Sequence, residues 1–214
     1  ADIPGEHDLA MTTNGSALAR YAKKLKAAGL QRVTISMDAL NPDIFVRMNG
    51  TGASPERVIE GVDAALEHGL KVKINSVIQK GVNEDEIVKL ARFGRERGVT
   101  MRFIEYMDVG VTNGWRMDEV LPSADVVALV QQAYPLILLP ESVTGETAQR
   151  WVARAITGEV TTGSALILHG HILAEHQRYH SRGLVLKELF TTTHQPPVSA
   201  EWGYWAISLR VGGG

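Results

Sequence analysis

Short strand-like runs alternate with amphipathic helical segments over the first half of the chain. The strand-like runs are apolar or alternate between apolar and polar residues, and they occupy residues 8–13, 32–38, 71–79 and 100–108. The segments between them carry apolar residues at helical spacing, and they end at Gly29, Gly69 and Gly98. Four strand–helix units in series predict parallel strands joined by right-handed crossovers, so the sequence indicates the α/β class.

Several helix starts carry capping signals. Ser16 is expected to cap the first helix, and Ser54 followed by Pro55 to open the second. Asn83, with Glu86 one turn later, predicts a capping box at the start of the helix after the third strand. These signals set the expected boundaries of the helices between the strands.

The chain is expected to divide into three regions. Four strands do not close a barrel, so residues 1–135 are interpreted as a partial (β/α) barrel whose sheet edges need other segments to cover them. This region includes a helix expected at about residues 123–133. Residues 136–160 begin a C-terminal region. Residues 161–214 are interpreted as a divergent tail, because Asp and Asn are absent from it and its acidic residues are Glu175, Glu188 and Glu201.

Histidines are crowded into this tail and raise the question of a metal site. His176 and His180 are one helical turn apart, with His169 and His171 nearby. Glu175 is the nearest carboxylate in the sequence. Solvated histidines in a polar tail are the interpretation that we prefer, so no metal ligand is predicted.

The alternation within two strands separates a polar face from an apolar one. In residues 32–38, Thr34, Ser36 and Asp38 alternate with apolar residues, and Lys73 and Asn75 do so in the next strand. Strands covered by helices turn their apolar side toward the helices, so the polar side is expected to line the lumen. Two interpretations stay open at this point: a network in which Lys73 pairs with Asp38, or a ligand site.

Lys71, two residues before Lys73, is interpreted as a solvent-exposed residue at the strand end. It shares the polar face with Lys73 because side chains alternate along a strand. It therefore provides an internal comparison for any role assigned to Lys73.

Composition narrows the functional classes. The 214 residues carry a formal net charge of −2 and scattered Lys and Arg, which gives no sign of a nucleic-acid partner. The apolar stretches are too short to span a bilayer, so a cytoplasmic protein without a membrane partner is expected. Cysteine is absent. This excludes disulfides, a cysteine nucleophile, thiolate-bound zinc and an iron–sulfur cluster held by thiolates of this chain.

A series of motifs follows the predicted strands and turns. They are MTTNG at residues 11–15, RVTISMDAL at 32–40, MNG at 48–50, KVKIN at 71–75, QKGVN at 79–83, RFIEYMDVG at 102–110 and NGW at 113–115. In this order and spacing the motifs resemble those of the GTP 3′,8-cyclases, radical S-adenosylmethionine (SAM) enzymes of molybdenum cofactor biosynthesis. The resemblance covers residues 8 to about 160 and implies a partial (β/α) barrel of the radical SAM type.

The resemblance also implies roles for individual residues. Thr12, Lys73 and Arg102 are expected to bind GTP, and Ser36 and Met107 to bind SAM. No catalytic residue is carried over. The implied reaction converts GTP to (8S)-3′,8-cyclo-7,8-dihydroguanosine triphosphate with 4Fe-4S clusters and SAM as cofactors. The implied partners are cyclic pyranopterin monophosphate synthase and a second copy of the chain in a homodimer.

The sequence departs from the family where iron–sulfur chemistry begins. The family's CxxxCxxC loop and the cysteines of its C-terminal cluster have no counterpart here, so the chain is expected to be inactive by itself. Residues 212–214 are glycines and resemble the family's Gly-Gly ending. Two alternatives remain: a non-catalytic binder of nucleotide or SAM, and a Schiff-base aldolase-like barrel that uses Lys73.

Anaerobic iron–sulfur reconstitution tests the consequence of the missing cysteines. We expect this chain not to cleave SAM after reconstitution, because it offers no thiolate to hold a cluster. The measurement is chromatographic detection of 5′-deoxyadenosine together with iron analysis. Production of 5′-deoxyadenosine with about four irons per chain would contradict this expectation.

Overall fold

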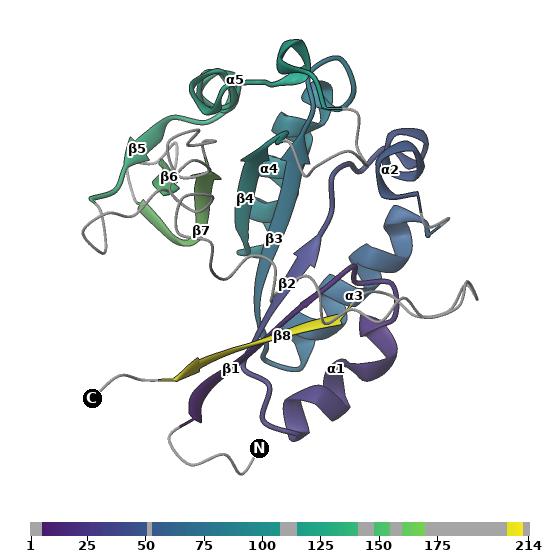
Figure 1. Ribbon diagram of the computed structural model, residues 1–214. Helices are drawn as coiled ribbons and strands as arrows, with labels where there is room; N and C mark the ends of the chain where they lie inside the picture. Colours follow the sequence, from purple (N-terminus) through teal and green to yellow (C-terminus); the bar gives the residue numbers. More distant parts are fainter. Residues whose placement is uncertain are drawn as a thin grey trace, which may run out of the picture.

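The computed structural model describes residues 6–50, 53–107, 115–140, 148–154, 160–169 and 205–211. Within these ranges, helices pack against one eight-stranded sheet (Figure 1). The strands are β1 (Glu6–Thr13), β2 (Arg32–Ser36), β3 (Lys71–Ile78), β4 (Thr100–Glu105), β5 (Leu136–Leu138), β6 (Ala148–Arg154), β7 (Val160–His169) and β8 (Trp205–Val211). The α-helices are α1 (Leu18–Ala27), α2 (Pro42–Asn49), α3 (Pro55–Glu67), α4 (Ile87–Arg97) and α5 (Ser123–Ala133), and the 3₁₀ turns are η1 (Glu84–Glu86) and η2 (Met117–Glu119).

The sheet is built around four parallel strands. Its order is β5-β6-β7-β4-β3-β2-β1-β8, in which β1 to β4 run parallel in the middle. Strand β7 continues the parallel pairing beside β4, whereas β8 pairs antiparallel with β1. The predicted α/β class and its parallel strands are therefore confirmed, as a partial barrel. The two exposed edges that the sequence predicted are covered by β7 and β8.

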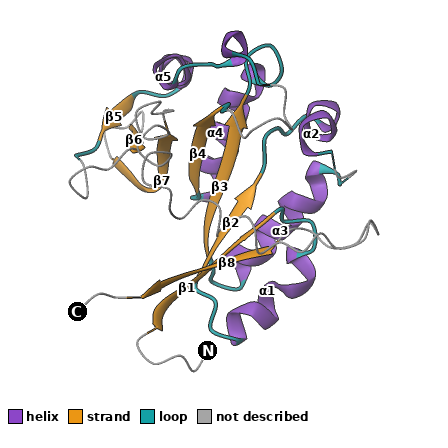
Figure 2. Ribbon diagram, viewed as in Figure 1, coloured by secondary structure: helices purple, strands orange, loops and turns teal. Residues whose placement is uncertain are grey.

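The helices cover one face of the central strands (Figure 2). Alternate strand residues on that face are almost inaccessible to solvent and pack with apolar residues from the helices in one core. The core residues from the strands include Val33, Ile35, Ile74, Met101 and Phe103, and those from the helices include Leu18, Val58, Val62 and Leu90. Burial of these side chains is the main favourable term for the fold. The polar residues between them consequently point to the opposite, open face, as predicted.

Helix α2 was missed by the sequence analysis. Asn41 caps this helix, because its side-chain oxygen accepts hydrogen bonds from the backbone N–H groups of Asp43 and Ile44. Gly50 ends it in a left-handed conformation with φ of 62°. The helix buries Phe45 on its core side. One buried residue in eight gives too weak a periodic pattern to identify a helix from spacing alone.

Strands β5 to β8 were also not predicted. Strands β7 and β8 belong to the tail interpreted as divergent, and both pair with the sheet. Residues 170–204 and 212–214 of that tail lie outside the described residues, and with them His171, His176, His180 and the terminal glycines. The division of the chain at residues 135 and 160 stays a prediction. None of the described helices is long and apolar enough to cross a membrane.

Two predicted helix caps are wrong. The Ser16 hydroxyl donates to Asn14 Oδ1 at 2.9 Å instead of capping α1, which begins at Leu18. Asn83 and Glu86 do not form a capping box. The Glu86 carboxylate, fully buried, accepts hydrogen bonds from the backbone N–H groups of Leu40 and Asn41 at 2.7 and 2.9 Å. It thereby joins η1 to the start of α2.

Asn83 is fully buried where β2 and β3 end, and it uses both ends of its amide. Its Oδ1 accepts from the Gln79 N–H at 2.9 Å. Its Nδ2 donates to the carbonyl oxygens of Asp38 and Val77, each at 2.8 Å. Backbone groups from the ends of two strands are therefore satisfied by one side chain, which holds these ends together.

Replacement of Asn83 tests this connection. We expect Asn83→Ala to lower the free energy of unfolding by about 2–4 kcal/mol, because it leaves buried backbone groups without partners. Urea denaturation measures the change. Asp85→Ala is the matched control, since Asp85 is exposed in the same turn, and it should change stability by no more than about 0.5 kcal/mol. Equal effects of the two substitutions would contradict the role of Asn83.

Candidate functional site

Residues assigned from the sequence lie in two neighbouring rows across the open face of the sheet. Thr12, Thr34, Lys73 and Thr100 pair with one another from β1 to β4 and form the first row. Ser36, Asn75 and Arg102 pair from β2 to β4 and form the second row. The strand registers thus bring four of the five predicted binding residues, Thr12, Ser36, Lys73 and Arg102, onto one surface.

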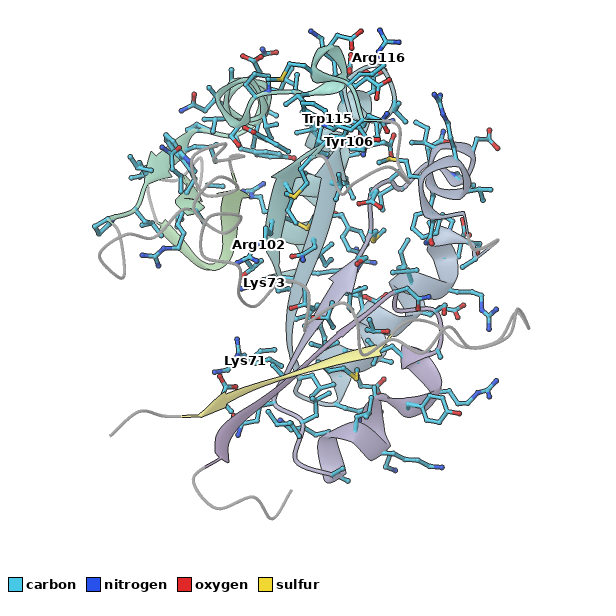
Figure 3. The ribbon with its side chains drawn as sticks, in the orientation of Figure 1. Lys71, Lys73, Arg102, Tyr106, Trp115 and Arg116 are labelled. Atoms are coloured by element: carbon cyan, nitrogen blue, oxygen red, sulfur yellow. The ribbon has the colours of Figure 1, made fainter. Side chains whose placement is uncertain are left out.

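Two cations meet on this surface. Figure 3 labels Lys73 and Arg102 close together on β3 and β4, and Lys71 farther toward the start of β3. Burial lowers the pKa of Lys73, and the positive charges of Arg102 and Arg32 lower it further. An anion bound between Lys73 and Arg102 would relieve their repulsion and would raise the pKa of Lys73. This surface is therefore suited to an anionic ligand.

The ion pair between Lys73 and Asp38, one of the two interpretations that the sequence left open, is not formed among the described residues. Oδ1 of Asp38 accepts a hydrogen bond from the Val77 backbone N–H at 2.8 Å instead. Burial raises the pKa of Asp38 to about 6, and the hydrogen bond from Val77 only partly opposes that rise. Asp38 therefore ties the end of β2 to β3, and it does not neutralise Lys73.

The cations nearer the start of the strands are arranged differently. Arg32 forms an ion pair with Asp8, with its Nη2 at 2.7 Å from the carboxylate. Lys71 is exposed at the first position of β3, as predicted. Arg32 is thus neutralised and Lys71 is solvated, so the half-buried Lys73 is the more favourable of these positions for an anion.

Asn75 lies between Ser36 and Arg102 in the second row. Its Oδ1 is buried and has no hydrogen-bond partner among the described residues. The Ser36 side chain is exposed at the end of β2. Asn75 was predicted to share the polar face with Lys73 but was not included among the binding residues. Its position beside the other candidates was the signal that could have identified it.

Met107 lies beyond the end of β4, which stops at Glu105. The Tyr106 N–H still donates to the Ile78 carbonyl at 3.1 Å, so the chain leaves the sheet close to the carboxyl end of β3. The Trp115 Nε1–H donates to the Tyr106 carbonyl oxygen at 3.2 Å, and both residues are labelled in Figure 3. This bond holds Trp115 beside the end of β4. Met107 is thus at the strand-end edge, above the two rows.

A cation-binding cluster is not found in the part of the chain that the structure describes. No group of three or more His, Cys, Asp or Glu side chains converges there in a way that could hold a metal ion. Of the tail histidines, the structure describes only the backbone of His169, at the end of β7.

Comparisons with known proteins show which sequences this chain resembles. A family model described as the radical SAM superfamily matches residues 2–94. The GTP 3′,8-cyclase of Acidothermus cellulolyticus is 49% identical over 160 residues, which are 74% of this chain and 44% of that protein. The GTP 3′,8-cyclase of Xanthomonas axonopodis pv. citri is 46% identical over 159 residues, 74% of this chain and 48% of that protein. The chain thus spans about half the length of these relatives.

One solved structure is similar over part of the chain. Streptococcus suis SuiB bound to S-adenosylmethionine matches 58% of this chain and 28% of that chain, with 21% identity and a TM-score of 0.43.

The residues of this chain suit SAM as a ligand, but they do not suit an iron–sulfur cluster. An iron–sulfur cluster requires thiolates, and these 214 residues contain no cysteine, so the chain does not fit the cluster. SAM carries a ribose and an amino-acid end. The exposed Ser36 hydroxyl and the buried, unpartnered Oδ1 of Asn75 offer it hydrogen bonds.

The raised pKa of Asp38 predicts a pH-dependent stability. Its carboxyl group has an ordinary pKa of 3.8 and about 6 in the folded chain, so folding favours the neutral form. This contribution is fully present below pH 3.8 and is lost as the pH rises through about 6. Asp38→Asn stays neutral. We therefore compare the free energies of unfolding of the variant and the unsubstituted chain. Their difference should change in favour of the variant between pH 4 and pH 7, by at most about 3 kcal/mol.

Urea denaturation of both chains at several pH values measures this difference. Other titrating groups are shared by the two chains, so their contributions cancel. A difference that stays constant from pH 4 to pH 7 would show that burial does not perturb Asp38.

Proposed function

We propose that this chain, a homologue of the GTP 3′,8-cyclases within the radical SAM superfamily, binds GTP and SAM on the open face of its sheet. The observation that carries the proposal is the pair Lys73 and Arg102. These two cations lie in neighbouring rows of the same face, and no acidic side chain is ion-paired with Lys73 within the described residues. A nucleoside triphosphate would supply negative charge beside Lys73, whose pKa the positive charge of Arg102 lowers.

Three residues are assigned to the triphosphate. Lys73 offers a compact ammonium group, and Arg102 offers a guanidinium whose N–H groups match phosphate oxygens. Thr12 is in the same row as Lys73, two strands away, and its hydroxyl can donate to an oxygen of the ligand. The half-buried setting strengthens these contacts relative to solvent.

Two residues are assigned to SAM. Ser36 ends β2 beside Asn75, and Met107 lies just after β4, so both are near the carboxyl edge of the sheet. Ligands bind at this edge in folds built from parallel strands. Bound SAM would supply the radical chemistry of the superfamily. The part assigned to this chain is to bind and orient the cofactor next to the nucleotide.

The reaction of the complete relatives is proposed for the larger assembly, since this chain matches about half of their length. That reaction converts GTP to (8S)-3′,8-cyclo-7,8-dihydroguanosine triphosphate for molybdenum cofactor biosynthesis. Thiolates for the clusters would have to come from outside these 214 residues. Cyclic pyranopterin monophosphate synthase is the proposed consumer of the product, and a homodimer is the proposed assembly.

A second candidate function rests on the lowered pKa of Lys73. Burial and the nearby cations favour the neutral amine, which is the form that attacks a carbonyl carbon to give a Schiff base. Borohydride reduction in the presence of pyruvate separates the two functions. A stable adduct on Lys73 supports the aldolase-like function, and GTP binding without an adduct supports the nucleotide site.

Substitution of the three cations on the open face tests the nucleotide site. Lys73→Ala and Arg102→Ala should each weaken GTP binding about tenfold, because a charge-assisted hydrogen bond at a half-exposed site contributes about 1.5 kcal/mol. Isothermal titration calorimetry at low ionic strength measures the dissociation constant.

Lys71→Ala is the matched control. It removes the same charge from the same strand at an exposed position two residues away. It should leave the dissociation constant within about twofold of that of the unsubstituted chain. If Lys71→Ala weakens binding as much as Lys73→Ala, the attraction is a general electrostatic one, and the assigned site is wrong.

A further inference from the structure

The peptide group that leads into Met107 is held by a hydrogen bond from a tryptophan (Figure 3). The Tyr106 N–H donates to the Ile78 carbonyl at 3.1 Å, and the Tyr106 carbonyl accepts from the Trp115 Nε1–H at 3.2 Å. A peptide group is planar, so a hydrogen bond to its N–H or its carbonyl restricts the rotation of the whole unit. The two bonds at Tyr106 therefore restrict the two consecutive peptide units that precede the Cα atom of Met107.

Trp115 is followed by a segment that is attached to the ends of two strands. The Glu119 carbonyl accepts a hydrogen bond from the Lys80 N–H, just after β3, at 2.8 Å. The Ser123 N–H donates to the carboxylate of Glu105, the last residue of β4, at 2.6 Å. The indole donor is thus presented by a segment with its own attachments to the sheet.

The position of Met107 depends on this bond more than the positions of the two cations do. Strand β4 ends at Glu105, so regular strand pairing does not determine the backbone at Met107. Lys73 and Arg102 lie inside β3 and β4, each of which has a paired strand on both sides. Loss of the bond from Trp115 should therefore affect Met107 and leave the two cations in place.

We infer that Trp115 is a positioning residue for SAM, whose indole N–H orients the peptide group that places Met107 against the cofactor. This inference rests on the proposed function, in which Met107 binds SAM. Trp115 was not among the residues assigned to a ligand from the sequence. A side chain that is already held in its binding position loses less conformational freedom when the ligand binds. The bond therefore contributes to SAM affinity without a contact between Trp115 and SAM.

Replacement of the indole by a phenyl ring tests this role. Trp115→Phe keeps an aromatic side chain but removes the N–H donor, so it should weaken SAM binding about three- to tenfold. It should leave the dissociation constant for GTP within about twofold, because Lys73 and Arg102 are held by the sheet. Isothermal titration calorimetry with each ligand measures the two dissociation constants.

Trp151→Phe is the matched control. Trp151 lies on β6, and its Nε1 is buried without a hydrogen-bond partner among the described residues. The same substitution there removes an N–H that donates to no described group, so it should change neither dissociation constant by more than about twofold. An equal loss of SAM affinity at both positions would show a general effect of losing an indole, and would overturn the inference.

A double-mutant cycle with Met107→Ala distinguishes positioning from a direct contact with SAM. If Trp115 acts through Met107, Trp115→Phe should weaken SAM binding in the otherwise unsubstituted chain and have little further effect in the Met107→Ala variant. Fully additive losses of SAM affinity would show that Trp115 acts independently of Met107, and the inference would be wrong.

The two ligands separate the remaining outcomes. Parallel losses of SAM and GTP affinity in Trp115→Phe would show that Trp115 supports the fold as a whole, and would overturn the inference. Unchanged SAM affinity would overturn it as well, while the proposed function would stand. Absence of SAM binding by the unsubstituted chain would overturn the inference together with the proposed SAM site.

Discussion

The burial of one face of the parallel sheet under helices α1, α3 and α4 is the constraint from which the candidate site follows. Val33, Ile35, Ile74 and Phe103 must face these helices to be removed from water. Side chains alternate along a strand, so Lys73 and Asn75 on β3 and Arg102 on β4 have to face the other way. The parallel registers then determine which of these polar residues are neighbours. The same packing that stabilises the fold therefore assembles a cationic surface.

A second set of interactions fixes the carboxyl ends of the strands. Asn83 joins the ends of β2 and β3, and Glu86 joins the following turn to the start of α2. Burial acts to raise the pKa of Glu86, but hydrogen bonds from Lys89, Asn41 and Leu40 outweigh it and lower the pKa. The carboxylate is therefore ionised and can serve two backbone N–H groups. This network keeps the turns after β2 and β3 in place beside the site.

The parts of the fold predicted from sequence were those with strong periodicity. The alternation in β2 and β3 identified the buried face, and the place of Lys71 at the strand end identified its exposure. The helix expected at about residues 123–133 is α5. Helix α2 was not predicted, because Phe45 is its one buried residue and gives no periodic pattern. The capping role of Asn83 was wrong because local spacing cannot reveal that its amide reaches back to Asp38 and Val77. The bond from Asp38 to Val77, and hence the absence of a Lys73–Asp38 pair, likewise depends on contacts between strands.

The central claim is that the surface around Lys73 and Arg102 binds the triphosphate group of GTP. Competitive acylation of lysines, read by mass spectrometry with and without GTP, tests it within a single unsubstituted chain. Lys73 and Lys71 are on the same strand, so each experiment contains its own comparison. The structure predicts that saturating GTP slows acylation of Lys73 several-fold and leaves the rate at Lys71 unchanged. Equal protection of both lysines, or no protection of Lys73 at saturating GTP, would contradict the account.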